Sequence, residues 1–446
     1  MSVLFMGDKK PFSEIPGPKP TFLIGNIKDF IGQLPWEVCA KYGREYGGIT
    51  RVWLAGKPTL ILNDPDLIAQ ALDPSTGDFY KEAPGKAVTP LLTSASTFIL
   101  NGAAWEKSRA AAPFSATWFD DWLDSRVGLV REFIQVRTQA LAGTATDDLY
   151  ETIQALIFDV FSMTTLGRTL PPDLQKTFQS MANVGSSRIN SPIPVLPTSP
   201  YPCFHLARRK WFATFNQQVR ELQDQDDGNL VSAMLQGGTS LDAQGMSVSL
   251  ANLYFTGAFS TSSGTTSTLL SLSQHADAAA SVVAEIDAMK TDFEAPELAT
   301  CHHVDWNLRE SLRQYSPVSV WGRNVAKDHA IEFAGYTIPA NTDIMITNRF
   351  LHQDPNHWET PERYDPQRWA DGGMEKNSLG SGHYFPFGHG PRMCMGLPLA
   401  LFSMKMAVTT LLSRLKVEVT SGDEFKQDFY FGVMLPKGIR AQFSRR

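Results

Sequence analysis

One short stretch near the C-terminus constrains this chain more than any other feature. Residues 387–396 read Phe-Gly-His-Gly-Pro-Arg-Met-Cys-Met-Gly, so that a single cysteine, Cys394, stands in a glycine-rich turn. Arg392 lies two residues before the cysteine, and the aromatic Phe387 lies seven before it. Glycines such as Gly396 let the backbone adopt left-handed angles and pass close to a flat ligand. The stretch therefore predicts a tight loop built around one thiol.

A thiolate that binds a haem iron needs such surroundings. Backbone N–H groups of the turn can point at the sulfur and lower its basicity, and an arginine can pair with a haem propionate. The alternative is a buried structural cysteine in a turn. The spacing F-x-x-G-x-R-x-C-x-G resembles the haem-ligand loop of the cytochrome P-450 family at every fixed position, and we favour the haem interpretation. The resemblance implies haem b, with Cys394 as the iron ligand and Phe387, Arg392 and Gly396 as haem contacts.

Length and composition agree with one large catalytic domain. A chain of 446 residues gives a length-based expectation of about three domains, but no Gly/Ser-rich linker or low-complexity stretch divides it. We therefore predict an N-terminal extension over residues 1–14 and a single catalytic domain over residues 15–446. The four cysteines are widely spaced and form no CxxC pair, which indicates neither a disulfide framework nor a zinc site. A reducing cytoplasm is the expected location.

Charge and the N-terminal sequence exclude two kinds of partner. A net charge of −6 argues against nucleic acid. The apolar run at residues 1–6 is too short for a signal peptide or a membrane-spanning helix. The proline-rich stretch at residues 15–20 cannot be helical, and it resembles the hinge that opens the catalytic domain in this family. We expect a soluble chain of the bacterial type, without a membrane span.

The periodicity of the apolar residues predicts mostly helix with a few short strands. Helices are expected over residues 118–179 with a break at Pro171-Pro172, over 210–236 and over 249–289. Strands are expected over residues 51–54 and 59–62, which should form a hairpin, and over 330–336 and 429–443. The predicted fold class is mainly α with small peripheral β-sheets. The resemblance implies the same architecture, the cytochrome P-450 fold.

A pair of opposite charges precedes the cysteine loop in the sequence. Glu310 and Arg313 are three residues apart and would share one helical face, a pattern most often found on solvated helices. Downstream, residues 365–369 read Asp-Pro-Gln-Arg-Trp and resemble the family's P-E-R-F segment. The resemblance implies that Glu310, Arg313 and Arg368 form a buried charged triad that fixes the loop behind the haem. We interpret the similar Pro-Glu-Arg-Tyr at residues 361–364 as unrelated to this motif.

Two further segments carry residues that the family uses to bind haem. Trp105 and Arg109 are four residues apart on one predicted helical face. They resemble the family's W-x-x-x-R helix, whose polar ends hold a haem propionate. Arg323 stands where the family places a further propionate arginine. The resemblance extends from about residue 16 to residue 437, with the motifs in the family's order.

One departure from the family pattern bears on mechanism. Members that split dioxygen usually carry [AG]-G-x-[DE]-T-[TS] in the long helix above the haem. Here residues 256–261 read Thr-Gly-Ala-Phe-Ser-Thr. Gly257 keeps the small residue, Phe259 replaces the acid and Ser260 replaces the threonine. Phenylalanine cannot relay a proton, although it can also be a packing residue that points away from the haem.

Two mechanisms are compatible with this departure. Ordered water, Ser260 and Thr261 could supply the proton relay, with Gly257 beside these residues. The chain would then be an ordinary monooxygenase with altered proton delivery. Alternatively, the enzyme does not depend on that relay and uses peroxide, rearranges or dehydrates a peroxide-like substrate, or couples radicals. We favour the monooxygenase because a hydroxyl is retained. A non-catalytic haem binder is a minor alternative, since a sensor usually carries an output domain and none fits here.

The segments outside these motifs bear on the substrate and the electron donor. Apolar segments at residues 83–96, 318–321 and 431–435 correspond by their order to the family's substrate contacts and suggest an apolar or aromatic small molecule. The predicted pocket residues are Val318, Val320, Trp321, Phe259, Val433 and Met434. No dinucleotide fingerprint or second cysteine cluster indicates a flavin or iron–sulfur module. Electrons should therefore come from a ferredoxin or flavodoxin with its reductase, docking near Cys394, where Arg392 and Lys405 are close in sequence.

Overall fold

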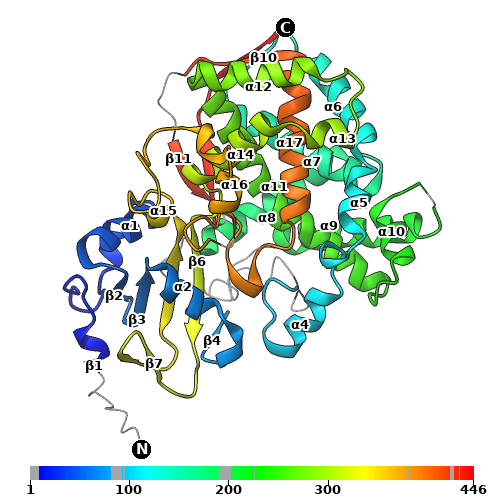
Figure 1. Cartoon of the computed structure of the whole chain (residues 1–446). Helices are drawn as coiled ribbons and strands as arrows, with labels where there is room; N and C mark the ends of the chain where they lie inside the picture. Colours follow the sequence, from blue (N-terminus) through cyan, green and yellow to red (C-terminus); the bar gives the residue numbers. More distant parts are fainter. Residues whose placement is uncertain are drawn as a thin grey trace, which may run out of the picture. The chain divides into compact units, whose positions relative to one another are not determined.

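The computed structural model describes residues 10–81, 93, 96–189, 202–225, 227–379, 381–421, 426–430 and 432–446. Contacts divide the chain into two compact units, each assembled from separate segments of the sequence. Unit 1 comprises Met1–Ala87, Ser319–Glu362 and Asn377–Met393. Unit 2 comprises Val88–Val318, Arg363–Lys376 and Cys394–Arg446. The elements of both units are labelled in Figure 1.

Unit 1 is built on a mixed five-stranded sheet. The strand order is β2 (Ile49–Leu54), β3 (Lys57–Leu62), β9 (Asp343–Thr347), β6 (Val320–Val325) and β4 (Phe79–Tyr80). The β3–β9 pair is parallel and the other pairs are antiparallel. A smaller sheet has the order β1 (Lys10–Pro11), β8 (Tyr336–Ile338) and β7 (Ile331–Phe333). Distant parts of the sequence therefore meet in both sheets.

The core of unit 1 lies on both faces of the larger sheet. Leu60 and Leu62 point to one face, where they join a buried cluster with residues of α2 (Pro65–Leu72). Ile61 points to the other face and packs with residues of α1 (Pro35–Tyr46). This alternation follows from the two-residue period of a strand. The remaining short elements of unit 1 are η1 (Phe12–Glu14), η2 (Ile27–Asp29), η3 (Pro74–Thr76), α15 (Asn348–Leu351) and η6 (Gly390–Arg392).

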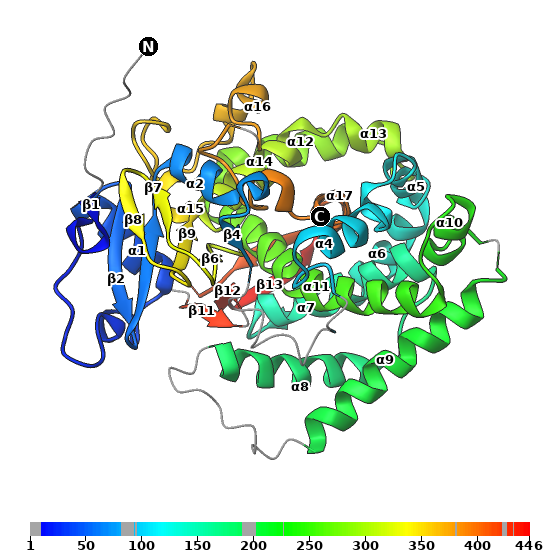
Figure 2. The ribbon, with the colours of Figure 1, turned by 90° about the horizontal axis from the view of Figure 1, so that it is seen from below.

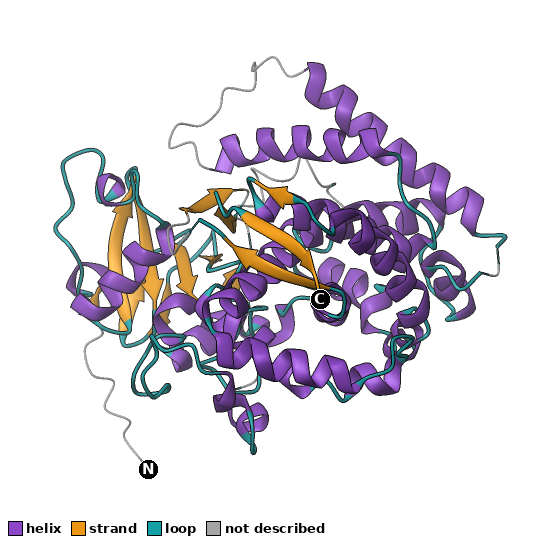
Figure 3. Ribbon diagram, turned by 90° about the horizontal axis from the view of Figure 1, so that it is seen from above, coloured by secondary structure: helices purple, strands orange, loops and turns teal. Residues whose placement is uncertain are grey.

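Unit 2 is predominantly helical, as Figure 3 shows. The helices before the long central one are α4 (Gly102–Ala110), α5 (Phe119–Asp124), α6 (Val127–Leu141), α7 (Leu149–Leu166), α8 (Pro172–Ile189), α9 (Pro202–Leu222) and α10 (Leu230–Gln236). Those that follow it are α12 (Ala276–Ala288), α13 (Ala295–Ala299), α14 (His302–Gln314), α16 (Gly373–Lys376) and α17 (Leu397–Leu412). Two 3-10 turns, η4 (Pro113–Ser115) and η5 (Pro366–Trp369), complete the helical elements.

Helix α11 (Ala243–Gln274) is the longest helix of the described chain and packs against α7, α9, α14 and α17 (Figure 2). It begins where Asp242 accepts a hydrogen bond from the N–H of Gly245, a standard N-cap. Small residues let its neighbours approach closely: a Cβ at Gly257 would lie 2.7 Å from Cε2 of Phe161 in α7. The centre of unit 2 is thus a helix enclosed by other helices.

Small sheets flank these helices. One has the order β10 (Leu415–Val419), β13 (Ala441–Arg445) and β5 (Ala145–Thr146), and the other pairs β11 (Lys426–Tyr430) with β12 (Val433–Lys437). The second sheet is tied to α11, because the Ser263 hydroxyl donates to the carbonyl of Met434 at 2.6 Å. The Met434 N–H in turn donates to the carbonyl of Pro317 at 2.7 Å.

The predicted fold class, mainly helix with small sheets, is confirmed, but several predicted boundaries are wrong. The β2–β3 hairpin forms as expected, although Pro58 lies inside β3. The helix expected over residues 118–179 is four helices, interrupted by a turn at Gly143 (φ 82°) and by β5. The strand expected over 330–336 is split by a turn at Ala334 and Gly335, both with positive φ.

The other helix boundaries are set by capping residues that periodicity does not detect. Helix α9 begins at Pro202 rather than at residue 210, and α10 is separate because Asn229 caps it. Helix α11 begins at Ala243, before the predicted residue 249, and His275 separates it from α12. The segment expected as strand over residues 429–443 is three strands, the first of which begins at Lys426.

Some predictions are not addressed by the described chain. Residues 1–9, most of the segment 83–96, and Phe431 in the segment 431–435 lie outside it. The boundary between an extension and a catalytic domain at residue 15 stays a prediction. Among the helices that are described, none combines the length and the apolar character needed to cross a membrane.

Candidate active site

The cysteine loop passes from unit 1 to unit 2 between Met393 and Cys394. Gly388 (φ 77°) and Gly390 (φ 69°) adopt left-handed angles that favour glycine. The turn is closed by the Met393 N–H, which donates to the Gly390 carbonyl at 2.9 Å. Gly396, with φ −78°, is the N-cap of α17. The glycines before the cysteine therefore shape the loop, and the one after it begins a helix.

Cys394 differs from the two other cysteines whose side chains are described. Its side chain is exposed and forms no disulfide, whereas Cys39 and Cys301 are buried. Burial raises the pKa of Cys39 to about 12 and that of Cys301 to about 11. A buried thiol of this kind stays protonated near neutral pH and is a poor metal ligand. Among these three described cysteines, Cys394 is therefore the one best suited to bind a metal as a thiolate.

Helix α4 brings the predicted pair of haem contacts together. The Arg109 guanidinium carbon lies 5.8 Å from the centre of the Trp105 ring, and Trp105 is buried. Burial lowers the pKa of Arg109, while the neighbouring Cys394, when ionised, raises it. Within unit 2, Trp105, Arg109 and Cys394 thus form one group in which a partly buried cation faces the thiol.

Unit 1 contains two further cations predicted to contact haem. Arg323 lies in β6, is buried, and donates from Nη1 to the carbonyl of its neighbour Gly322 at 2.8 Å. Its pKa is lowered to about 10, first by burial and then by the positive charge of Arg392 in η6. Because two guanidinium groups repel each other, an anion bound between them would be stabilised. Phe387 precedes η6 in the same unit.

The predicted relay residues lie on different faces of α11. Thr256 is exposed, Gly257 and Ser260 are half-buried, and Ala258, Phe259 and Thr261 are buried. The Ser260 hydroxyl reaches the carbonyls of Thr256 and Gly257, both at 3.3 Å. The Thr261 hydroxyl is buried and has no hydrogen-bond partner among the described residues. Thr256 and Ser260 thus mark the accessible face of an otherwise enclosed helix segment.

Phe259 occupies an aromatic cluster. Its ring stacks on Phe178 of α8, with centroids 4.7 Å apart and planes inclined by 20°. The Tyr430 ring of β11 meets it edge-on at 5.4 Å. The Tyr430 hydroxyl in turn donates to the side chain of Asn183 and accepts from Gln179 at 2.9 Å, both in α8. Phe259 therefore joins α11 to α8 and β11, and its role as a pocket residue stays a prediction.

The other predicted pocket residues are divided between the units. Val433 and Met434 in β12 are buried in unit 2, and Val318 is half-buried at the end of the same unit. Val320 and Trp321 lie in β6 of unit 1, where the Trp321 ring is 5.3 Å from that of Phe385. The Met434–Pro317 backbone hydrogen bond places β12 beside the segment that contains Val318. Their contact with a substrate stays a prediction.

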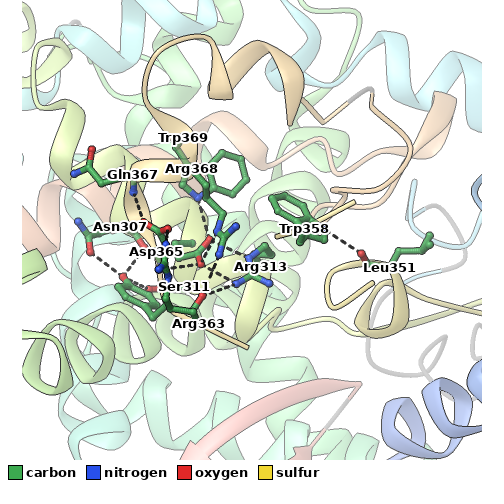
Figure 4. Close-up of polar contacts among 12 residues, drawn as sticks. Asn307, Ser311, Arg313, Leu351, Trp358, Arg363, Asp365, Gln367, Arg368 and Trp369 are labelled. Atoms are coloured by element: carbon green, nitrogen blue, oxygen red, sulfur yellow. Dashed lines mark hydrogen bonds and ion pairs between the residues drawn. The ribbon is translucent and has the colours of Figure 1, made fainter. Parts of the chain in front are cut away.

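The charged triad is assembled in unit 2 (Figure 4). Glu310 and Arg313 are fully buried and form a two-pronged pair, with Nε to Oε2 at 2.9 Å and Nη2 to Oε1 at 2.8 Å. Arg368 donates from Nε to Oε1 of Glu310 at 3.2 Å. The structure thus brings the three predicted residues into direct contact. Their predicted effect on the haem loop is a separate matter and stays a prediction.

Two donors to Glu310 escaped the sequence analysis. The Trp369 indole N–H donates to Oε2 at 3.1 Å, and the Asp365 backbone N–H donates to Oε1 at 2.9 Å. The Arg363 carbonyl, in the motif set aside above, accepts from Arg313 at 3.3 Å and from Arg368 at 3.2 Å. Trp369, at the end of Asp-Pro-Gln-Arg-Trp, could have indicated the contact with Glu310 in the sequence, because a buried indole N–H needs an acceptor.

Each unit, taken by itself, carries residues that suit part of a haem. Unit 2 supplies an exposed thiol beside a partly buried arginine and an accessible stretch of α11. Unit 1 supplies two like-charged arginines that an acidic group would stabilise. A haem has an iron that accepts a thiolate and two propionates that accept guanidinium hydrogen bonds. The donor set therefore matches the chemistry of this cofactor.

The chain is similar to several known proteins. A family model described as Cytochrome P450 matches residues 15–443. Thromboxane-A synthase of Mus musculus is 23% identical over 470 aligned residues, covering 90% of this chain and 86% of the relative. Cytochrome P450 3A13 of Mus musculus is 25% identical over 443, covering 91% and 85%. The crystal structure of the cytochrome P450DA heme domain superposes with a TM-score of 0.82 at 16% identity, covering 97% of this chain and 96% of that one.

The chain belongs to the cytochrome P450 family, because the family model covers nearly all of it. The predicted cytochrome P-450 fold is likewise confirmed by the structural superposition. Membership makes the chain an enzyme of the oxidoreductase class with a haem-iron cofactor, and supports a haem-thiolate monooxygenase in general terms. Family members act on small molecules and receive electrons from redox partners.

Proposed function

We propose that this chain inserts one oxygen atom from O2 into an apolar or aromatic small molecule, with haem b held by Cys394. Haem, when bound, supplies an iron at which dioxygen is activated. The observation that carries the proposal is the pair of hydroxyl side chains, Thr256 and Ser260, on the accessible face of α11. The segment around them is otherwise enclosed, so this face is where a ligand can meet the helix.

The cofactor contacts follow from the charges described above. In unit 2, the Cys394 thiolate binds the iron, Gly396 lets α17 begin directly after it, and Trp105 and Arg109 hold one propionate. In unit 1, Arg323 and Arg392 are suited to an acidic group, and Phe387 lies five residues before Arg392. An anion at these arginines offsets their mutual repulsion.

Ser260 is the residue that we assign to proton delivery. Its hydroxyl contacts the Thr256 and Gly257 carbonyls at 3.3 Å, at the long end of the hydrogen-bond range, so little is lost when it turns to a ligand or a water molecule. Thr261, whose buried hydroxyl lacks a partner within the described chain, is a second donor one residue further along. Phe259 cannot take part.

The substrate is held by apolar side chains. We assign Val433 and Met434 of β12, Val318, and Val320 and Trp321 of β6 to the chamber walls. These side chains offer no charge, so binding rests on burial of apolar surface. An apolar or aromatic substrate therefore suits them better than a charged one.

Electrons come, in this proposal, from a separate ferredoxin or flavodoxin with its reductase. The local cations differ from the sequence expectation, since Lys405 is mostly buried and pairs with Asp305 at 2.7 Å. Lys405 is therefore a weak candidate for docking an acidic partner, and Arg392 is already assigned to the haem in this proposal. Turnover reconstituted with a ferredoxin and its reductase, compared with turnover with a diflavin reductase, tests this assignment.

If Ser260 delivers the proton, Ser260→Ala should uncouple the consumption of electrons from the formation of product. Without the hydroxyl, product per electron pair should fall by about a hundredfold, the usual scale of a general acid, and hydrogen peroxide should rise correspondingly. Ser262→Ala is the matched control, because Ser262 is buried and donates to the Ala258 carbonyl at 2.6 Å. Product and peroxide are measured against reductant consumed.

A second candidate function is favoured by the replacement of the acid by Phe259. An enzyme that uses peroxide, couples radicals or rearranges a peroxide-like substrate needs no such relay. It should turn over without any electron donor, and Ser260→Ala should leave its rate unchanged. Turnover that depends on the donor and tolerates Ser260→Ala would instead move the assignment to Thr261.

A further inference from the structure

A second ligand site is suggested by a cavity between α9 and the start of α11. Its volume is about 400 Å3, which is the size of a small-molecule site. Helix α9 contributes His205, Arg208, Arg209 and Phe212, and α11 contributes Gln244 and Val248. All of these residues belong to unit 2. α9 packs on both α8 and α11 in this part of the molecule (Figure 2).

The lining of this cavity is positively charged. The side chains that line it within the described chain include two arginines and one histidine but no aspartate or glutamate. Arg209 is exposed and forms no ion pair with any described residue. The chain as a whole carries a net charge of −6, whereas the charged side chains that line this cavity are cationic. Such a site attracts an anion.

The start of α11 strengthens this preference. Gln244 lies in the first turn of a 32-residue helix, where the helix dipole favours negative charge. The nearby Asp242 is the N-cap, and its carboxylate accepts from the Gly245 N–H at 2.7 Å. That acid serves the helix end and is absent from the cavity lining.

The remaining lining selects the rest of the ligand. The Arg208 guanidinium carbon lies 5.0 Å from the centre of the Phe212 ring, so a cation and an aromatic face are presented together. Val248 adds apolar surface opposite, on α11. A site with this lining suits a planar apolar body that carries one negative group.

The two faces of α9 have separate roles. Trp211 and Phe215 point into the protein and are buried, and the Trp211 ring stacks on Phe178 with centroids 5.4 Å apart. Arg208, Arg209 and Phe212 face the cavity instead. The cavity side of α9 is thus separate from the side that packs into the protein, and on it Arg209 is exposed.

We propose that this cavity binds a small aromatic or apolar anion, such as a ring bearing a carboxylate or sulfonate, as a second ligand of the protein. The proposal goes beyond the haem chemistry and does not depend on it. Binding should require the charge of Arg208 and Arg209 and the apolar contact of Phe212 together.

Equilibrium dialysis of the full-length holoprotein with naphthalene-2-sulfonate tests the proposal. The double variant Arg208→Gln/Arg209→Gln should bind this probe about tenfold more weakly, since charge-assisted hydrogen bonds are lost. The control Arg220→Gln removes a charge from the exposed side of the same helix, outside the cavity, and should bind within about twofold of the parent. 2-Naphthol has the same ring system and no charge at neutral pH, and the proposed substrate chamber can also hold it, so it should bind equally to all three proteins.

A second variant guards against misfolding of the first. Ala213→Trp fills the cavity from its exposed rim without removing a charge, and should also abolish binding of the sulfonate. Equal affinity of the parent and both cavity variants would overturn the proposal. Inorganic sulfate that binds as tightly as naphthalene-2-sulfonate would overturn its apolar part, leaving a plain anion site.

Discussion

At the scale of single residues, burial and neighbouring charge distinguish the cysteines more clearly than their positions in the sequence do. Cys39 and Cys301 are buried and their pKa values are raised to about 12 and about 11, so both stay as thiols near neutral pH. Cys394 is exposed and adjoins the partly buried Arg109. A cation next to a thiol favours the thiolate. The residue chosen by the loop pattern is thus also the one whose surroundings favour metal binding.

Cys394→Ser should abolish the long-wavelength Soret band that a thiolate-ligated haem shows after reduction and addition of carbon monoxide. The physical reason is that serine supplies no thiolate to the iron. Cys39→Ala and Cys301→Ala are matched controls and should keep the band in whatever protein folds. A histidine-type spectrum in the parent protein would contradict the ligand assignment.

Glu310→Ala should be strongly destabilising. The substitution leaves Arg313 buried without its carboxylate, at a cost of about 3–5 kcal/mol. Urea unfolding and the haem content of purified protein measure the effect. Trp369→Phe removes only one of the donors to Glu310 and should cost about 1 kcal/mol. Glu221→Ala breaks the exposed pair with Arg168 and should leave both measurements almost unchanged.

The contacts of the charged triad could be predicted from the sequence, because its motifs have fixed spacing. The contacts among Glu310, Arg313 and Arg368 were foreseen from the order of motifs, although Glu310 and Arg368 lie far apart in the chain. The donations from Trp369 and from the Asp365 backbone were not, since the geometry of η5 sets them. The cavity lined by α9 and α11 left no local signal, because its walls come from segments far apart in the sequence.

At the scale of elements, α11 is defined by what each of its faces touches. Thr256 and Ser260 lie on the accessible face, Gly257 packs against Phe161, and Phe259 joins the aromatic cluster with Phe178. Adjacent residues on a helix point about 100° apart, which explains how neighbours in the motif serve different partners. Phe259 is accordingly a packing residue of α11 in this structure.

Phe259→Glu should destabilise the protein rather than restore the family's relay. The carboxylate would be buried between aromatic rings, which raises its pKa above the ordinary value of about 4.3. For an acid with a raised folded-state pKa, stability is lost as the pH rises above the unfolded value. Thermal unfolding should therefore show a loss of about 3–4 kcal/mol at pH 7 and a smaller one at pH 5.

Phe259→Leu is the control for this prediction. Leucine keeps the apolar character and loses only part of the ring volume, so its effect should be smaller and independent of pH. A Phe259→Glu protein whose stability does not vary between pH 5 and pH 7 would show that the side chain escapes from the aromatic cluster into solvent.

Helices and strands with a long stretch of regularly spaced apolar residues were predicted well, but the positions of their ends were predicted poorly. The hairpin of β2 and β3 and the break before α8 followed from glycine and proline. The starts of α10 and α11 depend on the side chains of Asn229 and Asp242, which accept backbone hydrogen bonds. Such caps are single residues, so an analysis of periodicity passes over them.

At the scale of the whole molecule, neither unit is a continuous piece of chain. The larger sheet of unit 1 places β9 between β3 and β6, and Thr59 in β3 pairs with Asp343 in β9. Pairing of residues so distant in sequence makes folding slow, because a long loop must close first. This division could not be predicted from the sequence, since no linker marks it.

A fragment of residues 1–318 should not fold into either unit. It lacks β9 and β6, so β3 is left with an unpaired edge, and it lacks α17, which packs against α11. Unpaired strand edges and exposed apolar helix faces promote aggregation. Expression of the fragment should give insoluble protein, whereas the full chain under the same conditions should stay in solution. A soluble fragment with cooperative thermal unfolding would contradict this expectation.

The place of Cys394 in the chain has a consequence for biosynthesis. Trp105 precedes Cys394 by 289 residues, and at about 5–20 residues per second the ribosome needs roughly 15–60 seconds to make that stretch. Trp105 and Arg109, and later the α11 hydroxyls, are therefore made before the proposed iron ligand. Loading of the cofactor is therefore a late event of maturation, and a cell short of haem would accumulate completed chains rather than stalled ones.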